Sequence, residues 1–152
     1  MSKSAVVFYT WGGQAKTMAE EIAKLTGADI IEVKPKTPYS DNYSTCVKDA
    51  KKEMDEGKLP ELKETDFDMS AYDTVYLGSP IWFGTIAAPI AAFLTEVDLT
   101  GKIVKPFVTH GGGGKGHTDK DVAALCPGSD VKPALAVYEG GKKEEIEAWV
   151  RA

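Results

Sequence analysis

The chain has few of the residues that form disulfides or metal sites. It contains two cysteines, Cys46 and Cys126, in 152 residues, and they form no C-x-x-C pair. Its two histidines, His110 and His117, do not stand at zinc-ligand spacing from either cysteine. We therefore expect packed thiols rather than a redox or disulfide pair, and no metal site.

Excess basic charge and long apolar runs are also absent. With 18 Lys and Arg against 23 Asp and Glu, the formal net charge is −5. This balance argues against nucleic acid as a partner, because phosphate binding needs a basic face. No apolar run approaches the ~20 residues of a membrane span, and Met1–Ser4 leads into a strand pattern without a signal-peptide core. We expect a cytoplasmic protein that binds neither nucleic acid nor membrane.

The chain does contain a regular alternation of strand and helix patterns, which predicts a single domain over residues 1–152. Apolar, β-branched runs predict strands at 4–9, 29–33, 74–78, 103–109 and 134–138. Amphipathic spacing and end signals predict helices at 14–26, 41–56, 86–94, 118–125 and 143–151. This alternation is typical of an α/β protein in which helices cover both faces of a five-stranded parallel sheet.

Three of the predicted strands are followed by loops of small residues, at 10–15, 78–85 and 109–114. Ligands of open parallel sheets bind outside the carboxyl ends of the strands. Because these three loops leave the sheet at that edge, they could together form one pocket.

The first loop, Thr10–Ala15, joins a strand to a helix N-terminus. Free backbone N–H groups and the positive end of the helix dipole make such a junction an anion site. Gly12 and Gly13 permit conformations that other residues resist, while Thr10 adds a hydroxyl and Gln14 an amide. A phosphate cradle and an ordinary strand-to-helix turn both remain open for this loop alone.

The second loop carries Trp82 and Phe83 between Pro80 and Gly84. Adjacent aromatic side chains on a turn cannot both face the same core. We therefore expect one of them to stack on a flat aromatic ligand, with Trp11 of the first loop as a weaker candidate. Plain packing under the following alanine-rich helix is the alternative.

The third loop, Gly111–Gly114, exposes bare backbone to whatever lies beside it. It is not a P-loop, because Lys115 is followed by Gly116 rather than by Ser or Thr. The first loop likewise lacks the G-x-G-x-x-G spacing of dinucleotide-binding proteins. We therefore do not expect nucleoside triphosphate hydrolysis.

Two further function classes fit the sequence poorly. A Ser79–His110 nucleophile pair would need a G-x-S-x-G elbow, and Pro80 removes an N–H that an oxyanion hole would use. A receiver-type signalling domain needs aspartates at the ends of the first and third strands. Tyr9-Thr10 and Gly78-Ser79 stand there instead.

Two segments carry a family resemblance. Residues 77–85 read Leu-Gly-Ser-Pro-Ile-Trp-Phe-Gly-Thr, and residues 109–114 read Thr-His-Gly-Gly-Gly-Gly. Together with the stretch from Pro38 to Glu53, they resemble the short flavodoxin-like group, and the resemblance covers nearly the whole chain. It implies a flavodoxin-like three-layer, doubly wound sandwich with strand order 2-1-3-4-5, flavodoxin being a known example of this order, with FMN at the switch between strands 1 and 3.

The resemblance also implies which residues hold the cofactor FMN. The first loop would hold the phosphate, Ser79–Gly84 would flank the isoalloxazine, and Thr109–Gly114 would face its polar edge or its other side. The candidate cofactor-binding residues are therefore Thr10, Trp11, Gly12, Gly13, Gln14, Ala15, Ser79, Pro80, Ile81, Trp82, Phe83, Gly84, Thr109, His110, Gly111, Gly112, Gly113 and Gly114.

The phosphate loop departs from the family pattern, which resembles Ser-x-Thr-Gly-Asn-Thr. Gly12 and Ala15 replace two hydroxyl residues, and Gln14 replaces a shorter amide. A hydrogen bond to a charged group contributes ~1.5–3 kcal/mol, so losing one predicts roughly tenfold to hundredfold weaker binding. Backbone donors remain, and we expect FMN to bind.

We expect an FMN-binding electron-transfer protein, a low-potential one-electron carrier that is a monomer or weak dimer. Its partners would be redox proteins, a reductase and an acceptor. Excess acidic charge and an apolar stack both disfavour full reduction of a flavin. The alternative is an NAD(P)H-dependent FMN or quinone reductase of the same fold, because a bare glycine loop could leave one face of the ring open. No second nucleotide site is evident in the sequence.

Overall fold

The computed structural model describes residues 3–64, 67–110, 112, 114–138 and 143–151. Strands and helices alternate as the sequence predicts. In chain order they are β1 (Ser4–Phe8), α1 (Gln14–Thr26), β2 (Asp29–Glu32), α2 (Tyr43–Asp55), β3 (Thr74–Trp82), β4 (Thr85–Ile86), α3 (Ala88–Glu96), β5 (Ile103–His110), α4 (Thr118–Leu125), β6 (Asp130–Val131), β7 (Leu135–Tyr138) and α5 (Lys143–Arg151).

The sheet confirms the predicted strand order but not the predicted number of strands. Its main path is β2-β1-β3-β5-β6, with β7 also paired to β5, so the described sheet has seven strands rather than five. The expected fifth strand at 134–138 is present as β7, which pairs with the end of β5. Strand β6 is an additional short strand that pairs with the start of β5, and Pro133 lies in the gap between β6 and β7. Proline cannot donate a ladder hydrogen bond. The other unexpected strand, β4, folds back antiparallel on the end of β3.

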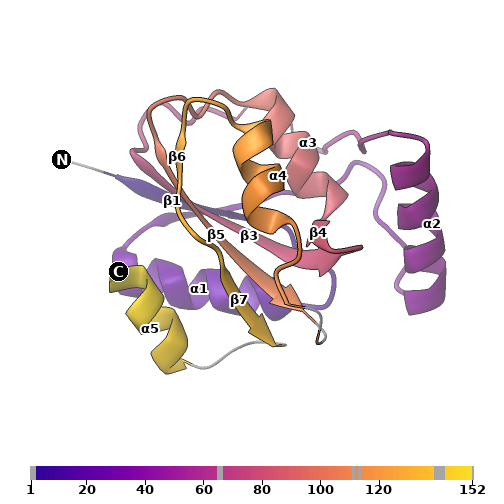
Figure 1. Ribbon diagram of the computed structural model, residues 1–152, viewed down its shortest axis with the longest axis horizontal. Helices are drawn as coiled ribbons and strands as arrows, with labels where there is room; N and C mark the ends of the chain where they lie inside the picture. Colours follow the sequence, from indigo (N-terminus) through magenta and orange to yellow (C-terminus); the bar gives the residue numbers. More distant parts are fainter. Residues whose placement is uncertain (1–2, 65–66, 111, 113, 139–142, 152) are drawn as a thin grey trace.

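Helices cover both faces of the sheet, which confirms the three-layer sandwich (Figure 1). Helices α1 and α5 pack on one face, where Phe8, Ile22 and Phe107 are fully or almost fully buried. Helices α3 and α4 pack on the other, where Leu77 and Phe93 are buried. Alternate residues of β1, β3 and β5 point to the two faces, as a sheet buried on both sides requires.

The centre of the sheet is packed tightly enough to need glycine at one position. Phe8, Gly78 and Phe107 stand side by side on β1, β3 and β5. A Cβ atom on Gly78 would lie 2.2 Å from the Phe107 ring. Gly78 therefore lets the Phe107 side chain lie across the central strand just before the strands reach the carboxyl edge.

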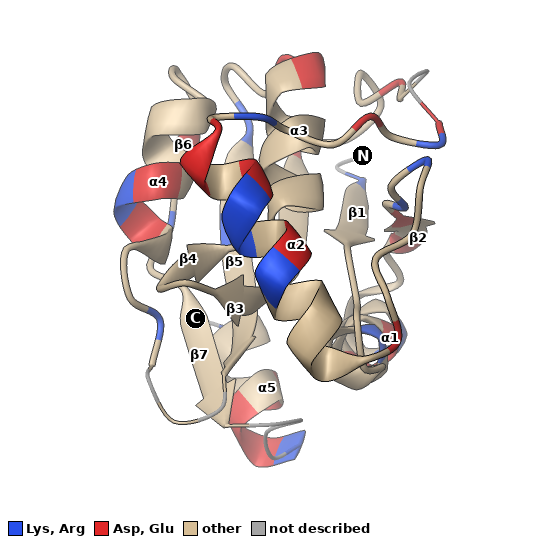
Figure 2. Cartoon of the chain, turned by 90° about the vertical axis from the view of Figure 1, so that its right-hand side faces the viewer, with Lys and Arg blue, Asp and Glu red and all other residues tan. Residues whose placement is uncertain are grey.

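Helix α2 lies beyond the carboxyl ends of the central strands rather than against a face of the sheet (Figure 1). Asn42 caps it by accepting a hydrogen bond of 3.0 Å from the Thr45 backbone N–H. Figure 2 shows acidic and basic residues interspersed along the ribbon of α2, and Lys51 and Asp55 of this helix form an ion pair of 3.6 Å. Its inner surface carries the less polar residues Cys46 and Ala50, which are buried.

Candidate functional site

The first loop leaves a helix N-terminus open to an anion. Gly13 adopts φ +95 and precedes α1, and no side chain caps that end of the helix. The Thr10 hydroxyl accepts a hydrogen bond of 2.9 Å from the Gly13 N–H, and the Gly13 carbonyl accepts from both the backbone and the hydroxyl of Thr17. The loop is thus held by its own contacts, and with no acidic residue in its first turn, α1 presents backbone N–H groups and a positive dipole end.

The second segment is a hairpin rather than a loop. Strand β3 continues to Trp82, and β4 pairs back on it, with Ile81 opposite Ile86 and Trp82 opposite Thr85. The two turn residues, Phe83 and Gly84, both have positive φ, +54 and +81. These values match a type I′ turn, whose twist suits a two-residue hairpin. Phe83 is strained there, because a bulky residue at positive φ is uncommon.

Within the hairpin the two aromatic side chains have different surroundings. Trp82 is partly buried and packs edge-on against Tyr9 and Tyr39, with ring centroids 5.6 and 5.0 Å apart. Phe83 is 42% exposed at the turn. Phe83 is therefore the side chain free to meet a flat ligand, and Trp82 forms the apolar support beneath it.

Ser79 belongs to the backbone network of this hairpin. It is fully buried. Its hydroxyl donates to the Pro80 carbonyl over 2.7 Å and accepts from the Ala87 N–H over 2.8 Å. The structure therefore uses Ser79 to hold the start of α3 and does not bring its side chain to a cavity wall.

The third loop is only partly described: Gly111 and Gly113 lie outside the described residues. The His110 Nδ1 atom accepts a hydrogen bond of 3.0 Å from the Gly112 N–H. The His110 ring lies 6.0 Å from that of Tyr138. Gly112 and Gly114 have φ of +129 and +75, so both use a conformation that favours glycine.

The segment after the third loop clamps the hairpin turn. The His117 N–H donates to the Gly84 carbonyl over 2.6 Å. Gly116, at φ +54, lies so close that a Cβ atom there would stand 2.0 Å from the same oxygen. Thr85 adds a hydroxyl hydrogen bond of 2.5 Å to Asp121 on α4. Gly116 and His117 are absent from the predicted site, because only the turn's position in space shows their role.

These segments surround a cavity of about 420 Å³. Its walls combine predicted site residues with the inner surface of α2. They comprise Trp11, Gln14, Tyr43, Cys46, Val47, Ala50, Pro80, Ile81, Trp82, Phe83, Thr109 and His110. The structure thus brings all three predicted segments together. Gly13, Gly84, Gly112 and Gly114 turn the adjoining backbone at positive φ, and Ala15 is buried in the first turn of α1. None of these five residues lines this cavity.

Helix α2 contributes a wall that is absent from the predicted site. The helical spacing of Tyr43, Cys46, Val47 and Ala50 was available as a signal, but such a stripe normally packs on a sheet. Here Trp11 fastens the helix, because its ring lies 6.0 Å from that of Tyr43 and its Nε1 donates to the Ser40 carbonyl. Burial and then the charge of Asp49 raise the pKa of the Cys46 thiol, so it stays protonated at neutral pH.

A second contact that holds α2 in place is a hydrogen bond of 2.5 Å, in which the Tyr39 hydroxyl donates to a Glu53 carboxylate oxygen. Burial and then this hydrogen bond raise the pKa of Tyr39. Burial, and then the nearby Cys46 and Glu53, raise the pKa of Tyr9. Both phenols therefore remain neutral at neutral pH.

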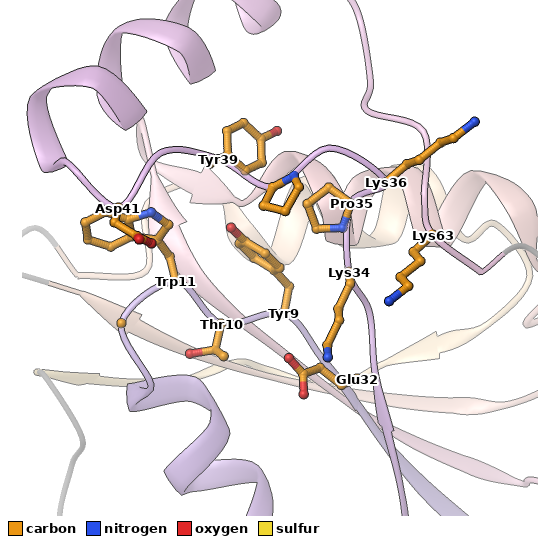
Figure 3. Close-up of a pocket in the computed structure, with 12 residues that line it drawn as sticks. Tyr9, Thr10, Trp11, Glu32, Lys34, Pro35, Lys36, Tyr39, Asp41 and Lys63 are labelled. Atoms are coloured by element: carbon orange, nitrogen blue, oxygen red, sulfur yellow. The ribbon is translucent and has the colours of Figure 1, made fainter.

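A larger cavity of about 830 Å³ lies on the other side of Trp11 (Figure 3). Thr10 and Gly12 line this one instead of the smaller cavity. Trp11 lines both and stands between them. Among the described residues, no group of three or more His, Cys, Asp or Glu side chains could hold a metal ion, and no helix is long and apolar enough to cross a membrane.

Comparison with known proteins identifies relatives over the whole chain. A family model described as flavodoxin matches residues 3–152. A solved structure from Bacteroides uniformis superposes with a TM-score of 0.89 at 23% identity, over 99% of each chain. The structure of a flavoprotein in complex with FMN from Lactobacillus acidophilus superposes with a TM-score of 0.76 at 24% identity, covering 98% of this chain and 99% of that one. At these identities the two likenesses show the fold.

One curated relative is named as an enzyme. A Cupriavidus metallidurans protein named NAD(P)H dehydrogenase (quinone) is 31% identical over 127 residues. The match covers 74% of this chain and 60% of that protein, so the chain spans less than two thirds of its relative's length.

Proposed function

Because the chain belongs to the flavodoxin family, whose model spans residues 3–152, we propose that it binds FMN and carries electrons between protein partners. One observation supports this most directly. The uncapped N-terminus of α1 and the cavity of about 420 Å³ adjoin each other, and Gln14 belongs to both. That arrangement matches a ligand with a phosphate at one end and a flat aromatic ring at the other.

The residues present fit FMN. The phosphate would be held by backbone N–H groups at the start of α1, where no acidic side chain competes. The ring would lie in the cavity between Phe83 of the hairpin and the inner surface of α2. Missing hydroxyls at Gly12 and Ala15 leave the phosphate site dependent on these backbone donors, on the Thr10 hydroxyl and on Gln14.

Bound FMN supplies reversible one-electron and two-electron chemistry, and this chain's residues position and tune it. Trp82, Tyr9 and Tyr39 form an apolar, neutral support. The formal net charge of −5 adds a repulsive field against a gain of negative charge. Both effects favour a potential below that of free FMN, which suits a low-potential one-electron carrier.

The test of the carrier proposal is an anaerobic redox titration of the FMN-loaded protein beside free FMN. We expect the fully reduced form to require a lower potential in the protein. A fully reduced form that is easier to produce than with free FMN would contradict the tuning argument. The proposal retains the cytoplasmic location, the reductase and acceptor partners, and the monomeric or weakly dimeric state expected from the sequence.

A second candidate is an NAD(P)H-dependent FMN or quinone reductase. Two observations favour it: the name of the Cupriavidus metallidurans relative and the exposure of Phe83 beside the cavity. Steady oxidation of NAD(P)H by the purified, FMN-loaded protein with a quinone would support the reductase. Electron uptake only through an added reductase protein would support the carrier.

A further inference from the structure

A charged groove runs along the β2 side of the molecule, separate from the proposed ring cavity. The cavity of about 830 Å³ in Figure 3 adjoins another of about 370 Å³. Both are lined by Glu32, Lys34 and Lys63. We call these two cavities together the β2 groove. It extends from Thr10 at the first loop to Phe67 at its far end.

Two lysines of the groove face each other across a pair of antiparallel segments. Pro35 pairs with Leu62, and the Lys63 N–H donates to the Lys34 carbonyl over 2.8 Å. This register places Lys34 opposite Lys63. In Figure 3 both side chains project to the same side of their segments, toward Glu32, whereas Lys36 projects away.

Lys34 and Lys63 form a like-charge pair, and the Glu32 carboxylate lines the same two cavities. Like charges directly opposite each other destabilise a strand pair. One step along the same register, Lys36 stands opposite Glu61 and forms an ion pair of 3.7 Å. Among the described residues, neither the Lys34 nor the Lys63 ammonium group has an ion-pair partner. A dianion between the two lysines would relieve the repulsion.

Glu32 supplies an acceptor beside the two cations. It is the last residue of β2, at the carboxyl edge of the sheet, twenty residues after Gly12. In dinucleotide-binding βαβ units, an acidic residue about 20 residues beyond the glycine loop accepts from a ribose hydroxyl. The glycine spacing of those units is absent here, so the parallel concerns only the placement of a carboxylate beside a groove.

We propose that the β2 groove binds the phosphorylated ribose of an adenine nucleotide. The phosphate lies between the Lys34 and Lys63 ammonium groups, and a ribose hydroxyl donates to Glu32. Pro35, Pro38 and Tyr39 give the larger cavity an apolar wall for the base. The groove shares Trp11 with the ring cavity and also reaches Thr10 and Gly12 of the loop proposed to hold the FMN phosphate, so the test below includes FMN displacement.

The test is calorimetric titration of the FMN-loaded protein with four probes: adenosine 2′-phosphate, adenosine 5′-phosphate, adenosine and inorganic phosphate. We expect one of the two nucleotides to bind at least tenfold more tightly than adenosine or phosphate. The 2′-phosphate is the group that distinguishes NADPH, and the 5′-phosphate is common to other adenine nucleotides. Preference for adenosine 2′-phosphate would therefore indicate NADPH as the ligand, and preference for adenosine 5′-phosphate would indicate another adenine nucleotide.

Substitutions in the groove test which side chains contact the nucleotide. K34Q and K63Q should each weaken nucleotide binding by about 10- to 100-fold, as expected for loss of a charged hydrogen bond. E32Q should weaken nucleotide binding without weakening inorganic phosphate. K48Q is the matched control, because it removes the same charge from an exposed α2 position that lines none of the three cavities, and it should leave binding unchanged.

Three results would overturn the proposal: no heat of binding at millimolar nucleotide, inorganic phosphate binding as tightly as either nucleotide, or equal losses in K34Q and K48Q. Displacement of FMN by the nucleotide would also overturn it, because that shows one shared site. FMN affinity is measured separately in each variant and should stay unchanged. Failure of the groove and failure of the FMN site are therefore distinguishable.

Discussion

Gly116→Ala tests whether the clamp on the hairpin turn holds the site together. The new Cβ atom would stand 2.0 Å from the Gly84 carbonyl oxygen and 2.7 Å from its carbon. These are backbone atoms, so no side chain can rotate away. Either Gly84 moves, or the segment at 116 moves and lengthens the 2.6 Å hydrogen bond from the His117 N–H.

The expected cost has two parts. A residue with a Cβ atom at positive φ is less stable than glycine by roughly 1–2 kcal/mol. The clash adds about 1–3 kcal/mol, the usual range for overpacking. Gly57 separates these parts, because it has a similar φ of +68 but no atom within 4 Å of an added Cβ. Gly57→Ala should therefore cost only the first part.

The assay is equilibrium urea unfolding of both variants, together with FMN titration. We expect G116A to be about 1–3 kcal/mol less stable than G57A, the overpacking range alone. Only G116A should weaken FMN binding, since its clash displaces the turn that carries Phe83. Equal stability losses with unchanged FMN affinity in both variants would refute the clamp.

Three further changes test other contacts. Phe83→Asn should raise the free energy of unfolding by up to about 1 kcal/mol, because an Asn-Gly pair suits the type I′ turn, yet it should weaken FMN binding; weaker folding with intact binding would contradict this. Burial raises the pKa of Tyr39. The folded state therefore keeps a proton that the unfolded state loses near the ordinary tyrosine pKa of about 10. The free energy of unfolding should fall as the pH rises above that value. Tyr39→Phe should make that fall shallower in urea titrations from about pH 9 to about pH 11, which bracket the ordinary tyrosine pKa, and an unchanged slope would count against the assignment. Ser79→Ala leaves the buried Ala87 N–H without its acceptor and should cost about 1–3 kcal/mol in unfolding experiments; a neutral effect would show that another acceptor replaces it.

The elements that the sequence predicts best are those with strong end signals. Helix α1 runs over the predicted residues 14–26, because Gly13 and Gly27 adopt positive φ at its two ends. Helix α4 likewise matches its predicted range of 118–125. The strand order follows from alternation and the family resemblance, and it holds although β4 and β6 add two short strands that the sequence does not predict.

The misses have physical causes that local pattern cannot show. The stretch from Ser79 to Trp82 contains proline, and phenylalanine at 83 is not a turn residue by preference, so the hairpin of β3 and β4 has no usual signal. The sequence does not predict the cavity wall formed by α2, because the helical spacing of its apolar residues does not show whether they face the sheet or a cavity. The pairing of Lys34 with Lys63 depends on a bridge between segments far apart in the chain.

The measurement that tests the central claim most directly is parallel titration of the purified protein with FMN and with riboflavin, followed by flavin fluorescence. If the α1 N-terminus and the cavity of about 420 Å³ grip one ligand together, FMN fluorescence will change at one equivalent. Riboflavin, which lacks the phosphate, will then bind at least tenfold more weakly. Unchanged FMN fluorescence at high micromolar protein, or equal affinity for the two flavins, would contradict the account.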